Sequence, residues 1–70
     1  MEMEYVDSSS IDQIGYDETQ GECHVVFKDG RHYIYSDVTQ ETWDNFRGAE
    51  SHGKFLNAEF KRKGYQYREL

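Results

Sequence analysis

A hairpin signal in the middle of the chain constrains the fold more than any other feature of the sequence. The dipeptide Asp29-Gly30 lies between two short runs, 23–27 and 31–35, that are rich in β-branched and aromatic residues. Because glycine adopts positive φ without a steric penalty, the chain can reverse direction there. Tyr33 and Tyr35 are two residues apart in the second run, so they share one face of a strand. The sequence therefore predicts an antiparallel hairpin with two tyrosines on one side.

The length of the turn decides which face carries the tyrosines, and two registers are open. A two-residue turn at Asp29-Gly30 makes Phe27 face His32. The tyrosines then share a side with His24, Val26 and Lys28. A three-residue loop with Gly30 as a bulge makes Phe27 face Arg31 instead. One face then holds Cys23, Val25, Phe27, Tyr33 and Tyr35, and the other holds His24, Val26, His32 and Ile34. We favour this second register because it produces the more apolar face.

A weaker strand pattern precedes the hairpin, over residues 11–16. Ile11 and Ile14 are three residues apart and do not alternate as the residues of a half-buried strand should. Residues 17–21 form a polar turn cluster that ends in Gly21. With the hairpin, these segments predict a three-stranded antiparallel meander. Residues 1–9 are expected to be a polar, frayed lead-in.

After Ser36 the hydrophobic period changes from two to 3.6 residues, which is typical of helices. Asp37 or Thr39 can cap a first helix through its side-chain oxygen. The apolar face of this helix consists of Val38, Thr42, Trp43, Phe46 and Ala49. A second helix is predicted from near Ser51 to about Lys63, followed by a C-cap glycine, Gly64. Its apolar stripe consists of Phe55, Leu56 and Phe60. Residues 65–67 have strand character and offer a short additional edge strand.

The fold class that follows is α+β: a three-stranded antiparallel meander covered on one face by two helices. A single domain over residues 10–70 accounts for these elements. A chain of 70 residues buries only about 60% of its unfolded surface, so few groups supply its stability. Aromatic residues make up 16% of the chain, and one large ring buries roughly 150–250 Å². We therefore expect an aromatic core beneath the helices.

The sequence also indicates a compartment. Cys23 is the single cysteine, so an intramolecular disulfide is excluded. No apolar run approaches the roughly 18–20 residues that span a bilayer. Residues 1–4 are acidic where a secretory signal would be positive and then apolar. These observations predict a soluble cytoplasmic protein without a membrane role.

Several short motifs follow one another in an order that resembles the KTSC domain family. They are Ser9-Ser10-Ile11, Ile14-Gly15-Tyr16-Asp17, Val25-Val26-Phe27, Tyr33-Ile34-Tyr35, Val38, Trp43, Phe46, Ala49-Glu50-Ser51-His52-Gly53 and Phe55-Leu56-Asn57. The family is named after the C-terminal extension of some lysyl-tRNA synthetases, and it also occurs as small stand-alone bacterial and phage proteins. The resemblance spans about residues 8–70. Thr39, Trp43 and Leu56 stand where the family commonly has proline, tyrosine and an aromatic residue.

This resemblance implies RNA as a ligand, because of the attachment to a synthetase, and it brings no catalytic residues. The charge pattern bears on the same question. The net charge is −6, yet residues 1–22 hold seven acids and no base, whereas residues 53–70 hold five bases and two acids. A local basic patch can bind phosphates even on an acidic domain. The predicted nucleic-acid-binding residues are Lys54, Lys61, Arg62, Lys63, Tyr65, Tyr67 and Arg68.

We therefore expect a non-enzymatic binding module with RNA as its leading ligand. The alternative is a protein-interaction domain, in which the acidic front and the face from His24 to Ile34 meet a partner protein. Tyr33 and Tyr35 are expected to pack under the helices rather than to stack on bases. Cys23 is expected to be a small buried residue, and not a nucleophile. The spacing of the three histidines does not match a zinc site, so no metal or cofactor is predicted.

Overall fold

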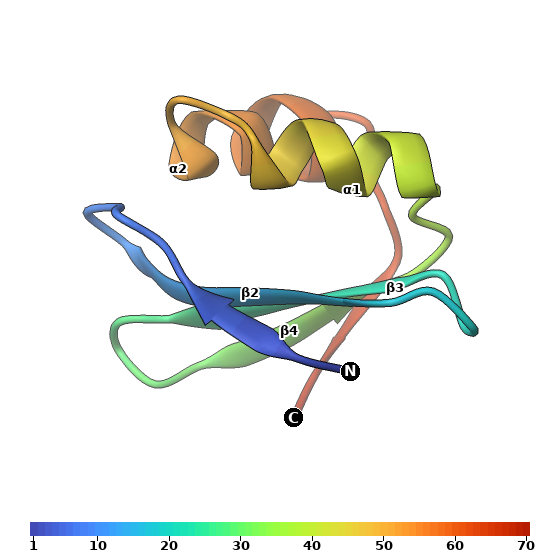
Figure 1. Cartoon of the computed structure of the whole chain (residues 1–70), viewed down its shortest axis with the longest axis horizontal. Helices are drawn as coiled ribbons and strands as arrows, with labels where there is room; N and C mark the ends of the chain where they lie inside the picture. The colour runs from blue at the N-terminus through green and yellow to red at the C-terminus, as the bar shows by residue number, and fades with distance from the viewer.

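A five-stranded antiparallel sheet forms one layer of the molecule, and three short helical segments form a second layer over one face of that sheet (Figure 1). The computed structural model describes residues 1–70. The strands are β1 (Met3–Tyr5), β2 (Ile11–Asp17), β3 (Glu22–Phe27), β4 (His32–Tyr35) and β5 (Tyr67–Glu69). They follow one another across the sheet in sequence order. The α+β class is confirmed, whereas the predicted three strands are two too few.

The central hairpin has the second of the two registers, the one that we favoured because it gathers the apolar residues on one face. Val25 pairs with Tyr33 and Cys23 pairs with Tyr35. The Phe27 N–H donates to the Arg31 carbonyl at 2.8 Å, and Gly30 has φ 94°. The loop is thus Lys28-Asp29-Gly30, and Gly30 occupies the position that needs positive φ. Cys23 and Val25 are buried beneath the helices as a result.

A β-bulge in β2 explains the spacing of Ile11 and Ile14. The pairing of β2 with β3 shifts by one residue between Ile11 and Gln13. An extra residue on one strand moves the alternation by one position, so residues three apart can point to the same face. Both isoleucines are fully buried in the core.

The two outer strands are the main differences from the predicted meander. Residues 1–9, expected to be a frayed lead-in, contain β1, in which Met3 pairs with Gly15 of β2. Gly15 permits this close approach, since an added Cβ would lie 2.4 Å from the Met3 sulfur and 2.9 Å from the Glu2 carbonyl oxygen. At the other edge, β5 pairs with β4 and places Tyr67 opposite Tyr35. The optional C-terminal strand therefore exists, two residues later than expected.

The helical layer begins with α1 (Gln40–Arg47), which is capped by Thr39. The Thr39 hydroxyl accepts a 3.1 Å hydrogen bond from the Thr42 N–H, so of the two predicted caps Thr39 is correct. Ser51 caps α2 (His52–Phe55) in the same way, through the Lys54 N–H at 3.3 Å. The chain continues directly into η1 (Leu56–Lys61), a π-helical segment with wider turns. Gly64, with φ 74°, then reverses the chain as predicted.

The core is an aromatic cluster between the two layers. Phe46 of α1 and Phe60 of η1 are fully buried, and their ring centroids are 5.3 Å apart. Trp43 stacks on Tyr16 of β2 at 5.5 Å, and the Tyr16 hydroxyl donates to the Val38 carbonyl at 2.6 Å. No helix in the structure has both the length and the apolar character needed to cross a bilayer.

Candidate functional site

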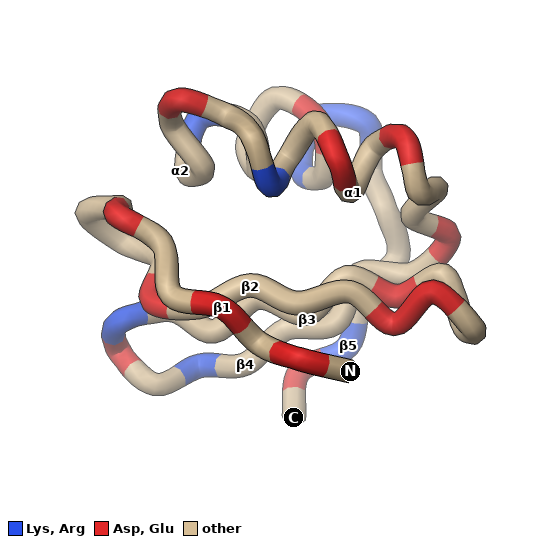
Figure 2. The backbone as a smooth tube through the Cα atoms, in the orientation of Figure 1, with Lys and Arg blue, Asp and Glu red and all other residues tan.

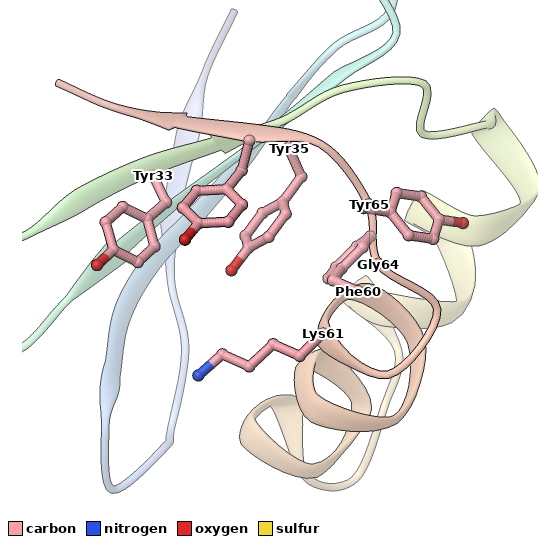
Figure 3. Close-up of a pocket in the computed structure, with 7 residues that line it drawn as sticks. Tyr33, Tyr35, Phe60, Lys61, Gly64 and Tyr65 are labelled. Carbon is pink, nitrogen blue, oxygen red and sulfur yellow. The ribbon is translucent and has the colours of Figure 1, made fainter.

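A pocket lies where η1 passes over the edge of the sheet formed by β4 and β5 (Figure 3). The turn at Gly64 creates it, because the chain leaves η1 there and returns to pair with β4. The pocket has a volume of about 320 Å³. Its lining contains no Asp or Glu and consists of Tyr33, Tyr35, Phe60, Lys61, Gly64, Tyr65 and Tyr67.

The four tyrosines of the pocket are buried to different degrees. Tyr35 is 2% exposed and stacks on Phe60, with ring centroids 4.9 Å apart and an interplanar angle of 16°. Burial raises the pKa of the Tyr35 phenol to about 12, so this hydroxyl stays protonated at neutral pH. Tyr67 is 61% exposed, and its ring lies 5.4 Å from that of Tyr33 and 5.6 Å from that of Tyr35. Tyr35 thus belongs to the core, and Tyr67 forms the open wall.

The hydroxyl groups of the pocket point in two directions. In Figure 3 the hydroxyls of Tyr33 and Tyr35 and the amino group of Lys61 extend to the same side of the pocket. The Tyr65 ring points away, and its hydroxyl donates to a Glu59 carboxylate oxygen at 2.7 Å. This bond, followed by the contact with Lys63, lowers the pKa of the Glu59 carboxyl. Tyr65 is therefore anchored away from the side on which the Tyr33 and Tyr35 hydroxyls and the Lys61 amino group lie.

The predicted basic cluster is divided by the structure. Lys63 pairs with Glu59 at 3.0 Å, and Arg68 pairs with Glu22 at 2.8 Å. Lys61 lines the pocket, and no ion pair engages Lys54, Lys61 or Arg62. Of the eight lysines and arginines in the chain, four are paired with carboxylates. Three of the remaining four lie on α2, η1 and the residue that follows, and the fourth is Lys28.

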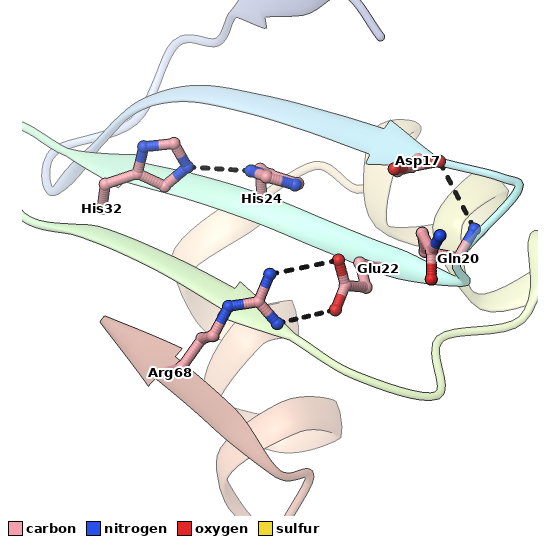
Figure 4. A network of polar contacts seen from close by, with 6 residues as sticks. All are labelled: Asp17, Gln20, Glu22, His24, His32 and Arg68. Atoms are coloured by element: carbon pink, nitrogen blue, oxygen red, sulfur yellow. Dashed lines mark hydrogen bonds and ion pairs between the residues drawn. The ribbon is translucent and has the colours of Figure 1, made fainter. Parts of the chain in front are cut away.

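Arg68 lies on the face of the sheet that no helix covers (Figure 4). Its guanidinium makes two contacts with the Glu22 carboxylate, and beside them His24 Nδ1 lies 2.9 Å from His32 Nε2. Burial, followed by the neighbouring His32, lowers the pKa of the His24 imidazole. Ile34, which shares this face, is only 2% exposed. Arg68 therefore serves this polar network and is separated from the pocket by the sheet.

Many acidic residues lie away from the pocket, although Glu59 of η1 and Glu69 of β5 are next to lining residues. Figure 2 shows acidic residues along β1, around the turn between β2 and β3 and also in the helical layer, and basic residues near α2 and η1 and in the turn between β3 and β4. A second hollow of about 280 Å³ lies at this acidic end, with three glutamates in its lining. The lining residues are Glu2, Glu4, Tyr16, Glu18, Gln40, Trp43 and Arg47. The two hollows therefore differ in charge, and only the tyrosine pocket has an environment suited to an anion.

The histidines and the cysteine were considered in the sequence as candidates for metal binding and catalysis. No three His, Cys, Asp or Glu side chains are placed to hold a metal ion. Cys23 is buried, and desolvation raises the pKa of its thiol to about 12. A protonated, inaccessible thiol is a poor nucleophile.

Sequence reasoning found three residues of the pocket and missed four. Lys61, Tyr65 and Tyr67 were predicted site residues, and the structure brings them together. Lys54, Arg62, Lys63 and Arg68 lie outside the lining. The missed residues are Tyr33, Tyr35, Phe60 and Gly64. Pairing of the C-terminal strand with the hairpin would have brought the tyrosines of both segments together.

Two comparisons with known proteins name the family, and a third finds a relative in another bacterium. The model of the KTSC domain matches residues 7–67. A protein of Tsukamurella paurometabola is 38% identical over 55 residues, covering 79% of this chain and 82% of that protein. The crystal structure of a KTSC domain protein from Yersinia pestis superposes with a TM-score of 0.89 at 30% identity, covering 99% of this chain and 96% of that one. The chain therefore belongs to the KTSC domain family.

Proposed function

We propose that this protein is a non-enzymatic module that binds single-stranded RNA through the tyrosine pocket. The observation that carries the proposal is the composition of the pocket, in which four tyrosines and Lys61 meet without a carboxylate. Proteins bind unpaired nucleotides by stacking bases on aromatic rings and by contacting phosphates with cations. Tyr67 supplies an open ring for stacking, and Lys61 supplies a cation beside it.

The distribution of free cations supports the same ligand. Lys54, Lys61 and Arg62 make no ion pair, so their charges remain available for phosphates. A cation already held by a carboxylate contributes less, as for Lys63 and Arg68. The free cations of the predicted interface are therefore Lys54, Lys61 and Arg62, on the surface of α2 and η1.

The net charge of −6 does not prevent binding at this surface. The molecule measures 27 × 22 × 20 Å, and the carboxylates of β1 and of the turn between β2 and β3 lie away from the pocket. At physiological ionic strength the Debye length is about 8 Å, so charges at opposite ends of the domain are largely screened from one another. The local potential near Lys61 then depends mainly on its neighbours.

A protein partner on the helix-free face is the other hypothesis, and the structure offers it less apolar surface than the sequence suggested. Ile34 of that face is only 2% exposed, so it offers little apolar surface to a partner. The paired side chains of Glu22 with Arg68 and of His24 with His32 cover much of the same face. Interface cores are depleted in charged residues, so RNA at the pocket is the better-supported function.

An NMR titration with a mixed pool of single-stranded RNA tests the proposal. At about 100 µM RNA and low salt, near 50 mM, we expect shifts in the amides of η1 and β5. The double variant Lys61→Glu and Arg62→Glu should abolish these shifts while the thermal melt stays the same. Lys28→Glu is a control for reversing a charge elsewhere, because Lys28 is the one free cation outside this surface. An unchanged spectrum for the native protein would reject RNA and promote the protein partner.

A further inference from the structure

The size of the tyrosine pocket restricts what can enter it. Its volume of about 320 Å³ lies at the lower end of the roughly 300–1,000 Å³ found for small-molecule sites. Phe60 and the buried Tyr35 close it on the core side, and Gly64 and Tyr65 close it where the chain turns. Such a space accepts one small ligand, and it does not form an extended groove for several stacked bases.

The chemistry of the lining defines that ligand further. Among the lining tyrosines only Tyr65 donates its hydroxyl to another group of the chain, so the hydroxyls of Tyr35 and Tyr67 are free to bond a guest. The tyrosine rings offer apolar and π surface, and Lys61 offers one positive charge. A matching guest is flat, carries hydrogen-bonding groups on its edge and bears an anion close to the ring.

We infer that the pocket is a single-nucleotide site, which takes one base of the strand against Tyr67 and the phosphate of that nucleotide against Lys61. The inference rests on the proposed function and specifies its ligand. Tyr67 carries the stack because it is the lining tyrosine with the most open ring. The neighbouring phosphates then leave the pocket along η1 and α2, where Arg62 and Lys54 are unpaired.

This arrangement fixes the length and salt dependence of binding. One inserted nucleotide with phosphates on Lys61, Arg62 and Lys54 makes about three phosphate contacts, so log K should fall with log salt at a slope near −2. Affinity should rise up to about three nucleotides and then remain nearly constant. A groove that binds a strand along its length would instead gain affinity with each added nucleotide.

Free nucleotides provide the direct test with the whole protein. AMP, adenosine and ribose 5-phosphate are titrated while amide shifts of η1 and β5 are recorded, and each is then used to displace a labelled RNA trimer. We expect AMP to bind more tightly than adenosine or ribose 5-phosphate, because only AMP uses both the ring and the cation. Lys61→Met should remove the preference for AMP over adenosine and leave adenosine binding unchanged.

Variants of Tyr67 separate stacking from folding. Tyr67 is exposed at the sheet edge, so its replacement should leave the domain folded. Tyr67→Ala should weaken AMP binding roughly 5- to 150-fold, whereas Tyr67→Phe keeps the ring and should weaken it much less. Equal losses in the two variants would overturn stacking as the source of affinity.

The outcomes distinguish the inference from the proposed function. If RNA binds but AMP neither binds nor displaces the trimer, the single-nucleotide site is overturned and RNA binding stands. If AMP binds in the pocket while RNA does not, RNA binding is overturned and the nucleotide pocket stands. If neither binds, both are overturned.

Discussion

Replacing Phe46 by alanine should remove most of the stability of this domain. Phe46 is fully buried, and its ring lies within 6.2 Å of the rings of Trp43, His52, Phe55 and Phe60. Truncating a phenylalanine in such a position costs about 3–5 kcal/mol, because transfer free energy is lost and a cavity remains. A domain of 70 residues has roughly 4–10 kcal/mol in total. The variant should therefore be at or near the point of unfolding at room temperature.

Phe27 provides the contrast that makes this prediction specific. The sequence assigns both Phe27 and Phe46 to apolar faces, but in the structure Phe27 is only half-buried and packs at the margin of the core, with its ring 5.4 Å from that of Tyr33. Phe27→Ala should then cost only about 1–2 kcal/mol. Urea unfolding followed by far-UV circular dichroism measures both values, and with a slope near 1 kcal/mol/M the midpoints should differ by about 2–3 M.

Two control variants test whether the loss of stability in Phe46→Ala comes from lost core packing. Tyr5→Ala removes an aromatic ring that is 77% exposed, so its midpoint should match that of the native protein. Phe46→Leu restores most of the lost volume and should recover much of the stability. Equal midpoints for Phe46→Ala and Phe27→Ala would refute the assignment of the core to the space between α1, η1 and the sheet.

Three further expectations concern the edge of the sheet and the titrating groups. Gly15→Ala brings a Cβ within 2.9 Å of the Glu2 carbonyl oxygen, so it should displace β1 and remove hydrogen-exchange protection there, and retained protection would contradict this. The pKa of His24 is lowered by burial, so the unfolded chain binds its proton first and stability should fall as pH drops below about 6.5; His24→Gln should flatten that part of the urea-midpoint profile. Tyr65→Phe removes the main cause of the low Glu59 pKa, and NMR titration should show that pKa rising.

Local sequence patterns were sufficient to predict the hairpin register and the starts of the helices. The turn glycine at position 30 and the alternation of Cys23, Val25 and Phe27 together predicted the register of the hairpin, because a slip by one residue would expose the apolar set. The sequence offered Asp37 or Thr39 as the first cap and a second helix starting near Ser51, and in the structure the side-chain oxygens of Thr39 and Ser51 cap the two helices. These features depend on neighbours in the sequence, which a single chain displays directly.

The outer strands depend on tertiary contacts, and that is why the sequence pattern did not predict β1. The strand Met3–Tyr5 is short, and it can pair with β2 only because Gly15, twelve residues after Met3, has no side chain. The ion pair between Glu4 and Arg47 of α1, at 2.9 Å, adds a further long-range tie. Neither contact leaves a periodic signal in the segment itself. The bulge in β2 similarly made a true strand look irregular.

The pocket depends on the short edge strand β5, which brings together residues that are far apart in the sequence. Tyr33 lies in the hairpin, Lys61 on η1 and Tyr67 in β5, and they come together only because β5 returns to pair with β4. The same strand carries Arg68 to the opposite face, where Glu22 engages it. Alternation along one strand therefore separates two residues that the sequence had placed in a single basic and aromatic cluster. The interface that we propose is smaller and more aromatic than the one predicted from the sequence, and its affinity for RNA should depend more on stacking than on the number of cations.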